Sequence, residues 1–330
     1  MGFEEIFGNE PAKNSLIHAI REDRVSNAYV FEGITGVGKK LAAHTFARGL
    51  VCENKQGEAP CDACPACRKA KSYNHPDIVY VTRTEDKASI GVDDVREQIL
   101  KEVYLKPYLS SRRVFIIGEG DALSPEAQNA LLKVLEEPPA FVTFVICVTK
   151  QEKLLDTVLS RSCVVTFFPL SFQEVSAYLE QKYGANEKTA LFARLSQGSI
   201  GAAETMLSDQ SAEQLYEDSI RAILRLQNNA LSVRETADFL ITEKERAAQI
   251  ADFFQTFLRD CVLLKSGMEE HVIYQNKRSD MRVFCDTVSK KGLIKAFDRL
   301  TDFKLRMKQN LNYGASVSET VMRIWEDFHG

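Results

Sequence analysis

Four of the eight cysteines stand close together, at spacings typical of metal ligands: Cys52, Cys61, Cys64 and Cys67. Two overlapping C-x2-C steps place three thiols on adjacent tight turns, and Cys52 follows the preceding predicted helix. Four thiolates leave no open coordination position, so they suit a structural zinc ion and not a catalytic one. An iron–sulfur cluster, or four unrelated free thiols, are the alternatives. The spacing favours structural zinc within an insertion at residues 52–67.

A second group of residues that could carry out chemistry is the glycine-rich stretch GITGVGKK, which begins at Gly33. Small residues let successive backbone N–H groups face phosphate oxygens, and a lysine adds positive charge. Gly33, Gly36, Gly38 and Lys39 are therefore the candidate nucleotide-binding residues. In a complete loop of this kind the next residue is Ser or Thr, whose hydroxyl binds magnesium; here it is Lys40, which would repel a cation.

The same magnesium ion needs an acidic residue where a later strand ends. The predicted strand VFII is followed by Gly118 at that position, with Glu119 next and still placed to polarise a water. Without the cation, phosphoryl transfer loses several kcal/mol of stabilisation, roughly three or more powers of ten in rate. We expect no independent ATPase activity and no productive use of ATP and Mg²⁺. Weak nucleotide binding and a plain glycine turn both stay open.

A third candidate is Arg161, in the stretch LSRSC just before a predicted strand. A lone arginine is most often half of a surface ion pair. Placed by a short turn at the rim of a parallel sheet, its planar and permanently charged guanidinium could also reach a phosphate on a neighbouring molecule. The residues alone leave both interpretations open.

The elements around these groups predict an α/β fold with a doubly wound parallel sheet. Apolar strands are expected at residues 28–31, 77–81, 114–117, 144–148 and 164–167, between helices at 1–27, 41–50, 92–105 and 126–137. Ser171 and Glu174 form a capping box, after which only helical patterns follow, including one at 293–311. We expect three domains: a sheet domain at 1–168, a helical lid at 169–210 and a helical bundle at 211–330.

Composition restricts the classes of function. The chain has 330 residues, 45% of them hydrophobic and 27% charged, which suits a globular protein of two or three domains. A net charge of −4 argues against general binding to polyanions, so contact with DNA would need a local patch or a partner. No long apolar run and no signal-peptide pattern stand in the sequence, and we expect a cytoplasmic protein without membrane contact.

Several motifs together resemble one family. They are Asn27-Ala28-Tyr29, the cysteine module, His75-Pro76-Asp77, the stretch LSPEAQNALLKVLEEPP that begins at Leu123, and the Ser160-Arg161 turn. The chain is similar to bacterial sliding-clamp loader subunits of the AAA+ class, and within them to the delta-prime family of DNA polymerase III. The resemblance covers the whole length and weakens after about residue 212. It implies a RecA-like P-loop domain, a lid, and a collar domain for oligomerisation.

The resemblance also implies roles and partners. In this family the arginine of the Ser-Arg turn enters the ATP site of the adjacent subunit, so Arg161 is expected to act in trans as an arginine finger. The implied partners are the ATPase subunits (gamma/tau), the delta subunit, the sliding clamp and primed DNA, within a DNA polymerase (nucleotidyltransferase) holoenzyme active in replication. Thr149 matches the family's sensor position. The lid stretch QGSIGAA lacks the arginine that active subunits offer to nucleotide, a departure that agrees with Lys40 and Gly118.

Two other classes of function remain as alternatives. One is an autonomous ATP-hydrolysing motor, such as a gamma/tau-type clamp-loader subunit or a Holliday-junction translocase; Lys40 and Gly118 argue against it. The other is a zinc-dependent nucleic-acid-binding module, for which only Arg68, Lys69 and Lys71 supply positive charge near the cysteines. We therefore expect a stator, that is, a fixed subunit without ATPase activity of its own that places Arg161 in the ATP site of a neighbouring subunit.

Overall fold

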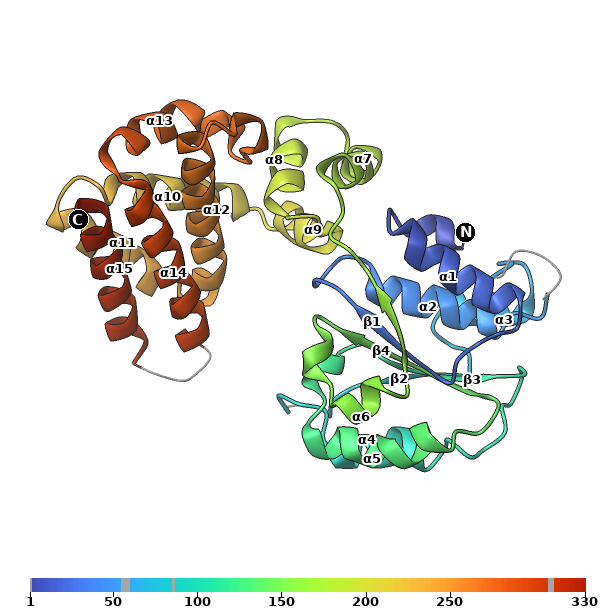
Figure 1. The fold of residues 1–330 in the computed structure, drawn as a ribbon. Coiled ribbons are helices and arrows are strands. Elements are labelled where there is room, and N and C mark those ends of the chain that lie inside the picture. Colours follow the sequence, from blue (N-terminus) through green and yellow to red (C-terminus); the bar gives the residue numbers. More distant parts are fainter. Residues whose placement is uncertain (1, 55–59, 85–86, 308–311) are drawn as a thin grey trace. The chain divides into compact units, whose positions relative to one another are not determined.

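The computed structural model describes residues 2–54, 60–84, 87–307 and 312–330. Residues 55–59 of the predicted zinc insertion and the end of the predicted helix at 293–311 lie outside this description. The chain forms two compact units, shown in Figure 1: Met1–Gly184 with Ser196–Ala203, and Ala185–Leu195 with Glu204–Gly330. Each unit is described by itself below. The expected boundaries at 168 and 210 stay a prediction.

The first unit contains a five-stranded sheet in the order β2-β3-β4-β1-β5, and every pairing is parallel. The strands are β1 (Ala28–Glu32), β2 (Ile78–Val81), β3 (Arg113–Ile117), β4 (Val142–Val148) and β5 (Cys163–Thr166). The inner strands β3 and β4 are buried along their whole length, as expected for a parallel sheet covered on both faces. The five predicted strands are confirmed to within two residues.

Helices cover both faces of this sheet (Figure 1). One face carries α1 (Glu10–Arg21), α2 (Lys39–Leu50) and α3 (Pro65–Lys71); the other carries α4 (Val92–Val95), α5 (Pro125–Glu136) and α6 (Asp156–Leu159). Ser124 caps α5, because its side chain accepts a hydrogen bond from the N–H of Ala127. The doubly wound α/β architecture predicted from the sequence is confirmed. It brings the segments that follow each strand to one edge of the sheet.

Three local expectations were wrong. The first helix does not span 1–27 but starts at Glu10, because Pro11 is tolerated only in a first helical turn. The expected helix at 92–105 is α4 followed by a π-helical turn, η2 (Arg96–Leu100), and then irregular turns. The apolar neighbours of Cys163 predict a core position for this residue, but it is exposed, because it lies on the edge strand β5, where only Val165 is buried.

The remaining helices follow the capping box. Ser171 accepts a hydrogen bond from the N–H of Glu174, and the Glu174 carboxylate accepts one from the N–H of Ser171, which starts α7 (Phe172–Tyr183) as predicted. The later helices are α8 (Glu187–Leu195), α9 (Ile200–Ser208), α10 (Ala212–Arg225), α11 (Ala230–Thr242), α12 (Ala247–Lys265), α13 (Arg278–Thr287), α14 (Lys290–Met307) and α15 (Tyr313–His329). Short 3-10 turns lie at Phe3–Glu5, Gly120–Ala122, Gln151–Lys153, Lys244–Arg246, Glu269–His271 and Gln275–Lys277. None of the helices in the described ranges is long and apolar enough to cross a membrane.

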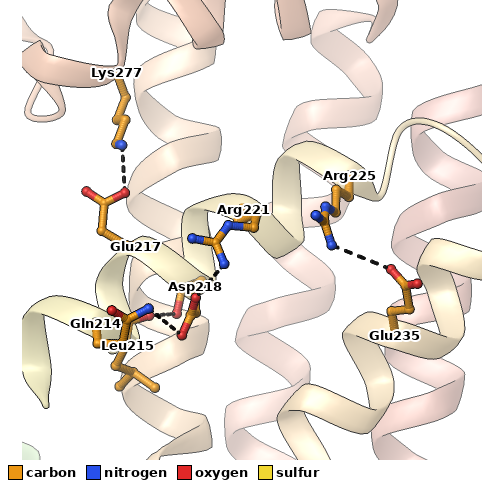
Figure 2. A network of polar contacts seen from close by, with 9 residues as sticks. Gln214, Leu215, Glu217, Asp218, Arg221, Arg225, Glu235 and Lys277 are labelled. Carbon is orange, nitrogen blue, oxygen red and sulfur yellow. Dashed lines mark hydrogen bonds and ion pairs between the residues drawn. The ribbon is translucent and has the colours of Figure 1, made fainter.

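The second unit is a helical bundle around an aromatic-rich core that includes Phe254, Phe257 and Phe284. Figure 2 shows polar contacts on the surface of this bundle, where Glu217 of α10 pairs with Lys277 at 2.7 Å. In the same view Arg225 of α10 faces Glu235 of α11 at 3.9 Å. Such partly exposed pairs are each worth about 0–1 kcal/mol, so burial of the apolar core, and not this network, stabilises the bundle.

Candidate functional site

The glycine-rich loop joins β1 to α2, the position that a phosphate-binding loop requires. Gly36 and Gly38 have φ of 78° and 107°, conformations that favour glycine. At Gly33 a Cβ would lie 2.3 Å from the carbonyl oxygen of Phe167, so a side chain is excluded by contact with the backbone that follows β5. The loop therefore has the backbone of a phosphate site, with the N-terminus of α2 behind it.

Lys39 is buried and its ammonium lies inside the loop. Its Nζ donates hydrogen bonds to the carbonyl oxygens of Gly33 (2.5 Å) and Ile34 (2.8 Å). Burial lowers the pKa of Lys39 below its ordinary value. In this structure Lys39, the lysine expected to contact phosphate, donates to the loop's own carbonyl groups.

Lys40 and Gly118 stand at the two positions where magnesium-binding residues were expected, and they lie next to each other in the structure. A Cβ at Gly118 would lie 3.4 Å from Cε and 3.6 Å from Cδ of Lys40, so the lysine side chain passes over the glycine. The Lys40 ammonium is 3.3 Å from a carboxylate oxygen of Glu119, and Arg83 is 3.8 Å from the other one. The Lys40 side chain therefore lies over Gly118, and two cations, Lys40 and Arg83, flank the carboxylate of Glu119.

Two polar residues near the loop were missed from the sequence. Arg83, after β2, is the second cation beside Glu119. The carboxylate of Asp121 accepts hydrogen bonds from the N–H of Thr149 at 3.0 and 3.1 Å, which fixes the chain where β4 ends. Their position after neighbouring parallel strands was the available signal, because the carboxyl ends of such strands meet at one edge.

The four predicted metal ligands come together. The Sγ atoms of Cys52, Cys61, Cys64 and Cys67 all lie within 4.8 Å of one another. Tetrahedral zinc with Zn–S bonds of about 2.3 Å requires sulfur atoms roughly 3.8 Å apart, so this donor set and spacing fit a closed thiolate site. A backbone hydrogen bond from Cys64 lowers the pKa of Cys61 to about 7, which favours the thiolate. This cluster could hold a metal ion.

The cysteine module is connected to the helix behind the phosphate loop. Arg48 of α2 has a side chain that is only 2% exposed, and its guanidinium forms an ion pair with the carboxylate of Asp62, which is 17% exposed. Asp62 follows the ligand Cys61 directly. A folded cysteine module therefore supplies the counter-charge for an arginine buried in α2.

Arg161 lies on the turn between α6 and β5, with 35% of its side chain exposed. One terminal nitrogen, Nη2, is 2.9 Å from the carboxylate of Glu136 at the end of α5. The other, Nη1, donates to the carbonyl oxygen of Thr157 (2.9 Å) and to the hydroxyl of Ser160 (3.2 Å). The guanidinium is thus held in one direction at the protein surface.

The sheet register separates Arg161 from the chain's own phosphate loop. Cys163, two residues after Arg161, pairs with Tyr29 near the beginning of β1, whereas the loop follows Glu32 at the end of β1. Strands rise about 3.3 Å per residue, so the two groups lie at opposite edges of the sheet, roughly 15 Å apart along the strand direction. Arg161 cannot reach a nucleotide in its own loop.

Two protein families match separate parts of the chain. Residues 8–171 match the family described as "DNA polymerase III, delta subunit", and residues 210–320 match "DNA polymerase III, delta subunit, C terminal". The first match contains the loop, the cysteines and Arg161. The second lies within the helical bundle.

Individual relatives agree with these matches. The DNA polymerase III subunit delta' of Bacillus subtilis (strain 168) is 27% identical over 94% of this chain and 94% of its own length. The tau/gamma subunit of Haemophilus influenzae is 31% identical over 78% of this chain, but the chain covers only 39% of that protein. A solved structure of a gamma-subunit-related protein from Thermotoga maritima covers 94% of this chain at 18% identity with a TM-score of 0.42, which is too low to add to the assignment.

Proposed function

We propose that this chain, which belongs to the DNA polymerase III delta-subunit family, works as a delta-prime-type subunit of a clamp loader. In this role it helps to load a sliding clamp onto primed DNA during replication, as a stator beside ATP-hydrolysing subunits. It hydrolyses no ATP itself and supplies Arg161 to the nucleotide site of a neighbour. Such a role places the chain in the cytoplasm, without membrane contact.

The absence of hydrolysis follows from the charges around the loop. Lys40 lies where a divalent ion would bind, and Gly118 offers no carboxylate to support one. Without the ion, the charge that develops on the transferred phosphoryl group lacks its main stabiliser. The residues Gly33, Gly36, Gly38 and Lys39 keep the form of a nucleotide site, but ATP and Mg²⁺ are not used productively there.

The observation that carries the proposal is the position of Arg161. A guanidinium that is partly exposed and lies at the sheet edge opposite its own loop is positioned to serve a nucleotide bound by another subunit. An arginine finger supplied in trans contributes about 10³–10⁵ in rate. A chain that has lost its own catalytic ion is then still required for catalysis by its neighbour.

The test is reconstitution with the ATPase subunits (gamma/tau), the delta subunit, the clamp and primed DNA. We expect Arg161→Ala to lower DNA-dependent ATP hydrolysis and clamp loading at least tenfold, while the complex still assembles. Arg161→Lys should recover little of the loss, because an ammonium cannot reproduce the planar fork of the guanidinium. Arg96→Ala is the matched control, since Arg96 is an exposed arginine of the same unit paired with Asp93 at 3.4 Å. Unchanged loading with Arg161→Ala would contradict the proposal.

Zinc is the metal we assign to the cysteine cluster. Four thiolates with no open position suit a structural zinc ion, which would hold the module against α2 through Asp62 and Arg48. The ion would have no part in the chemistry of ATP. Metal analysis should give about one zinc per chain; a substoichiometric metal content with four titratable thiols would remove the assignment.

An ATP-hydrolysing subunit of gamma/tau type is the second candidate, favoured by the 31% identity to the Haemophilus influenzae relative. It requires a divalent ion in the loop, which Lys40 and Gly118 oppose. Phosphate release by the purified chain at the rate of an ordinary motor would favour this candidate over the stator.

A further inference from the structure

The phosphate loop is contacted from outside by the segment that begins α9. The hydroxyl of Ser199 donates a hydrogen bond to the carbonyl oxygen of Thr35 (2.8 Å), and the N–H of Gly201 donates one to the carbonyl oxygen of Gly36 (2.9 Å). Residues 196–203 belong to the same compact unit as the loop. Two adjacent carbonyl groups of the loop are therefore bonded to one helical turn.

The two backbones touch at a pair of glycines. A Cβ on Gly201 would lie 2.8 Å from the Cα of Gly36, and a Cβ on Gly36 would lie 2.4 Å from the hydroxyl of Ser199 and 3.0 Å from the Cα of Gly201. Gly201 is helical, a position where alanine is normally more stable than glycine by about 0.5–1 kcal/mol. The close approach to the loop explains a glycine at this position.

Ser199 has a double role at this contact. It is buried, and its oxygen accepts a hydrogen bond from the N–H of Ala202 (3.0 Å) while its proton goes to Thr35. The hydroxyl thus satisfies the start of α9 and holds the loop at the same time. On the other side, the carbonyl oxygen of Gly198 accepts a hydrogen bond from the N–H of Leu170 (3.0 Å), which fixes the segment to the chain after β5.

We propose that the first turn of α9 is a brace that keeps the phosphate loop in one conformation without nucleotide. Lys39 bonds the loop carbonyls from inside and the Ser199–Gly201 turn bonds them from outside. In a working loop the phosphate oxygens accept hydrogen bonds from the loop N–H groups; here donors of the same chain hold the loop carbonyl groups instead. The brace itself does not depend on the stator function proposed above, but its consequence does. A loop that does not change shape with nucleotide keeps this unit rigid while the neighbouring subunits move.

The test is amide hydrogen exchange on the full chain without partners. In the wild-type protein we expect slow exchange at the hydrogen-bonded loop amides of Gly33 and Val37, which donate to the carbonyl oxygens of Val148 (3.2 Å) and Ile34 (3.4 Å), unchanged by millimolar MgATP. Gly201→Ala forces the turn and the loop apart, and a displaced close contact of this kind should raise exchange at these two amides about tenfold or more. Ser199→Ala, which removes the bond to Thr35 without adding bulk, should raise it in the same residues.

Gly314→Ala is the matched control. Gly314 is also the second residue of its helix, α15, but a Cβ there has no neighbour closer than 4.0 Å. Its exchange pattern at 33–38 should equal that of the wild type. Fast exchange of the wild-type loop, added protection with MgATP, or no effect of both Gly201→Ala and Ser199→Ala would each overturn the brace. These results need no partner subunit, so they are independent of the Arg161 test.

Discussion

The ion pair between Arg48 and Asp62 gives a quantitative test of how the cysteine module supports the sheet domain. We consider Asp62→Asn, which removes the negative charge and keeps the shape of the side chain. Asp62 has a φ of 56°, a left-handed conformation that asparagine adopts readily, so the substitution leaves the turn intact. The substitution removes the carboxylate that pairs with the guanidinium of Arg48.

The expected cost follows from burial. Breaking a buried ion pair from one side costs about 3–5 kcal/mol, because the remaining charge stays without compensation. Arg48 is 2% exposed and Asp62 is 17% exposed, which places the loss at the lower end, about 3 kcal/mol. Asp23→Asn is the control: it removes the partner of Arg112 in the same unit, but Asp23 is 71% exposed, and such pairs are worth about 0–1 kcal/mol.

Urea unfolding distinguishes the two units. The single tryptophan, Trp325, lies in α15 of the second unit, so its fluorescence reports that unit alone, whereas far-ultraviolet circular dichroism reports both. For Asp62→Asn we expect the circular-dichroism transition of the first unit to move to lower urea by about 1–2 M, with the Trp325 curve unchanged. Zinc content is measured in parallel. A shift no larger than that of Asp23→Asn would refute this account of the pair.

Three further predictions follow from the same contacts. Burial, with Arg48 as the smaller cause, lowers the pKa of His44 to about 4 from an ordinary 6.5, so the unfolded chain gains a proton before the folded chain does. The free energy of unfolding should therefore fall as the pH drops from 6.5 to 4, with His44 contributing at most about 1.4 kcal/mol per pH unit. His44→Gln should reduce this slope in urea titrations but not remove it, because burial also lowers the pKa of His75. Cys64→Ser should abolish stoichiometric zinc binding by metal analysis, whereas Cys147→Ser, in β4, should not; equal zinc in both variants would contradict the cluster. Lys40→Thr alone should leave ATP hydrolysis at background. The double variant Lys40→Thr with Gly118→Asp should bind a fluorescent ATP analogue in a magnesium-dependent way. Equal binding with and without magnesium would contradict the proposal that Lys40 takes the place of the magnesium ion.

The sheet was predictable from sequence because its strands are short apolar runs that lead directly into glycines or helix caps. β1 leads into the loop at Gly33, and Ser124 predicts the start of α5 because serine is a favoured N-cap residue. The segment after Val95 was not predictable in the same way. Its helical pattern continues, but Asp77, far away in sequence, binds the N–H groups of Tyr108, Leu109 and Ser110 and fixes a loop there.

The candidate site was predictable as a set of residues but not as an arrangement. The cysteine spacing indicated a cluster, and the structure brings the four sulfur atoms together. The sequence also marked Lys40 and Gly118 as separate departures, whereas the side chain of Lys40 lies over Gly118 in space. The pairing of Arg161 with Glu136 and the contact of Gly201 with Gly36 join residues distant in sequence, and no local pattern encodes such contacts.

We propose that the loop retains its shape without the ability to use a divalent ion, so that the chain contributes to catalysis only through Arg161. Phosphate release by the purified chain, with saturating ATP, magnesium and primed DNA, tests this claim most directly. We expect release at background level, unchanged by Arg161→Ala in the isolated chain. Steady turnover at roughly 1–10³ per second, which is typical of enzymes, would contradict the proposal that this chain does not hydrolyse ATP.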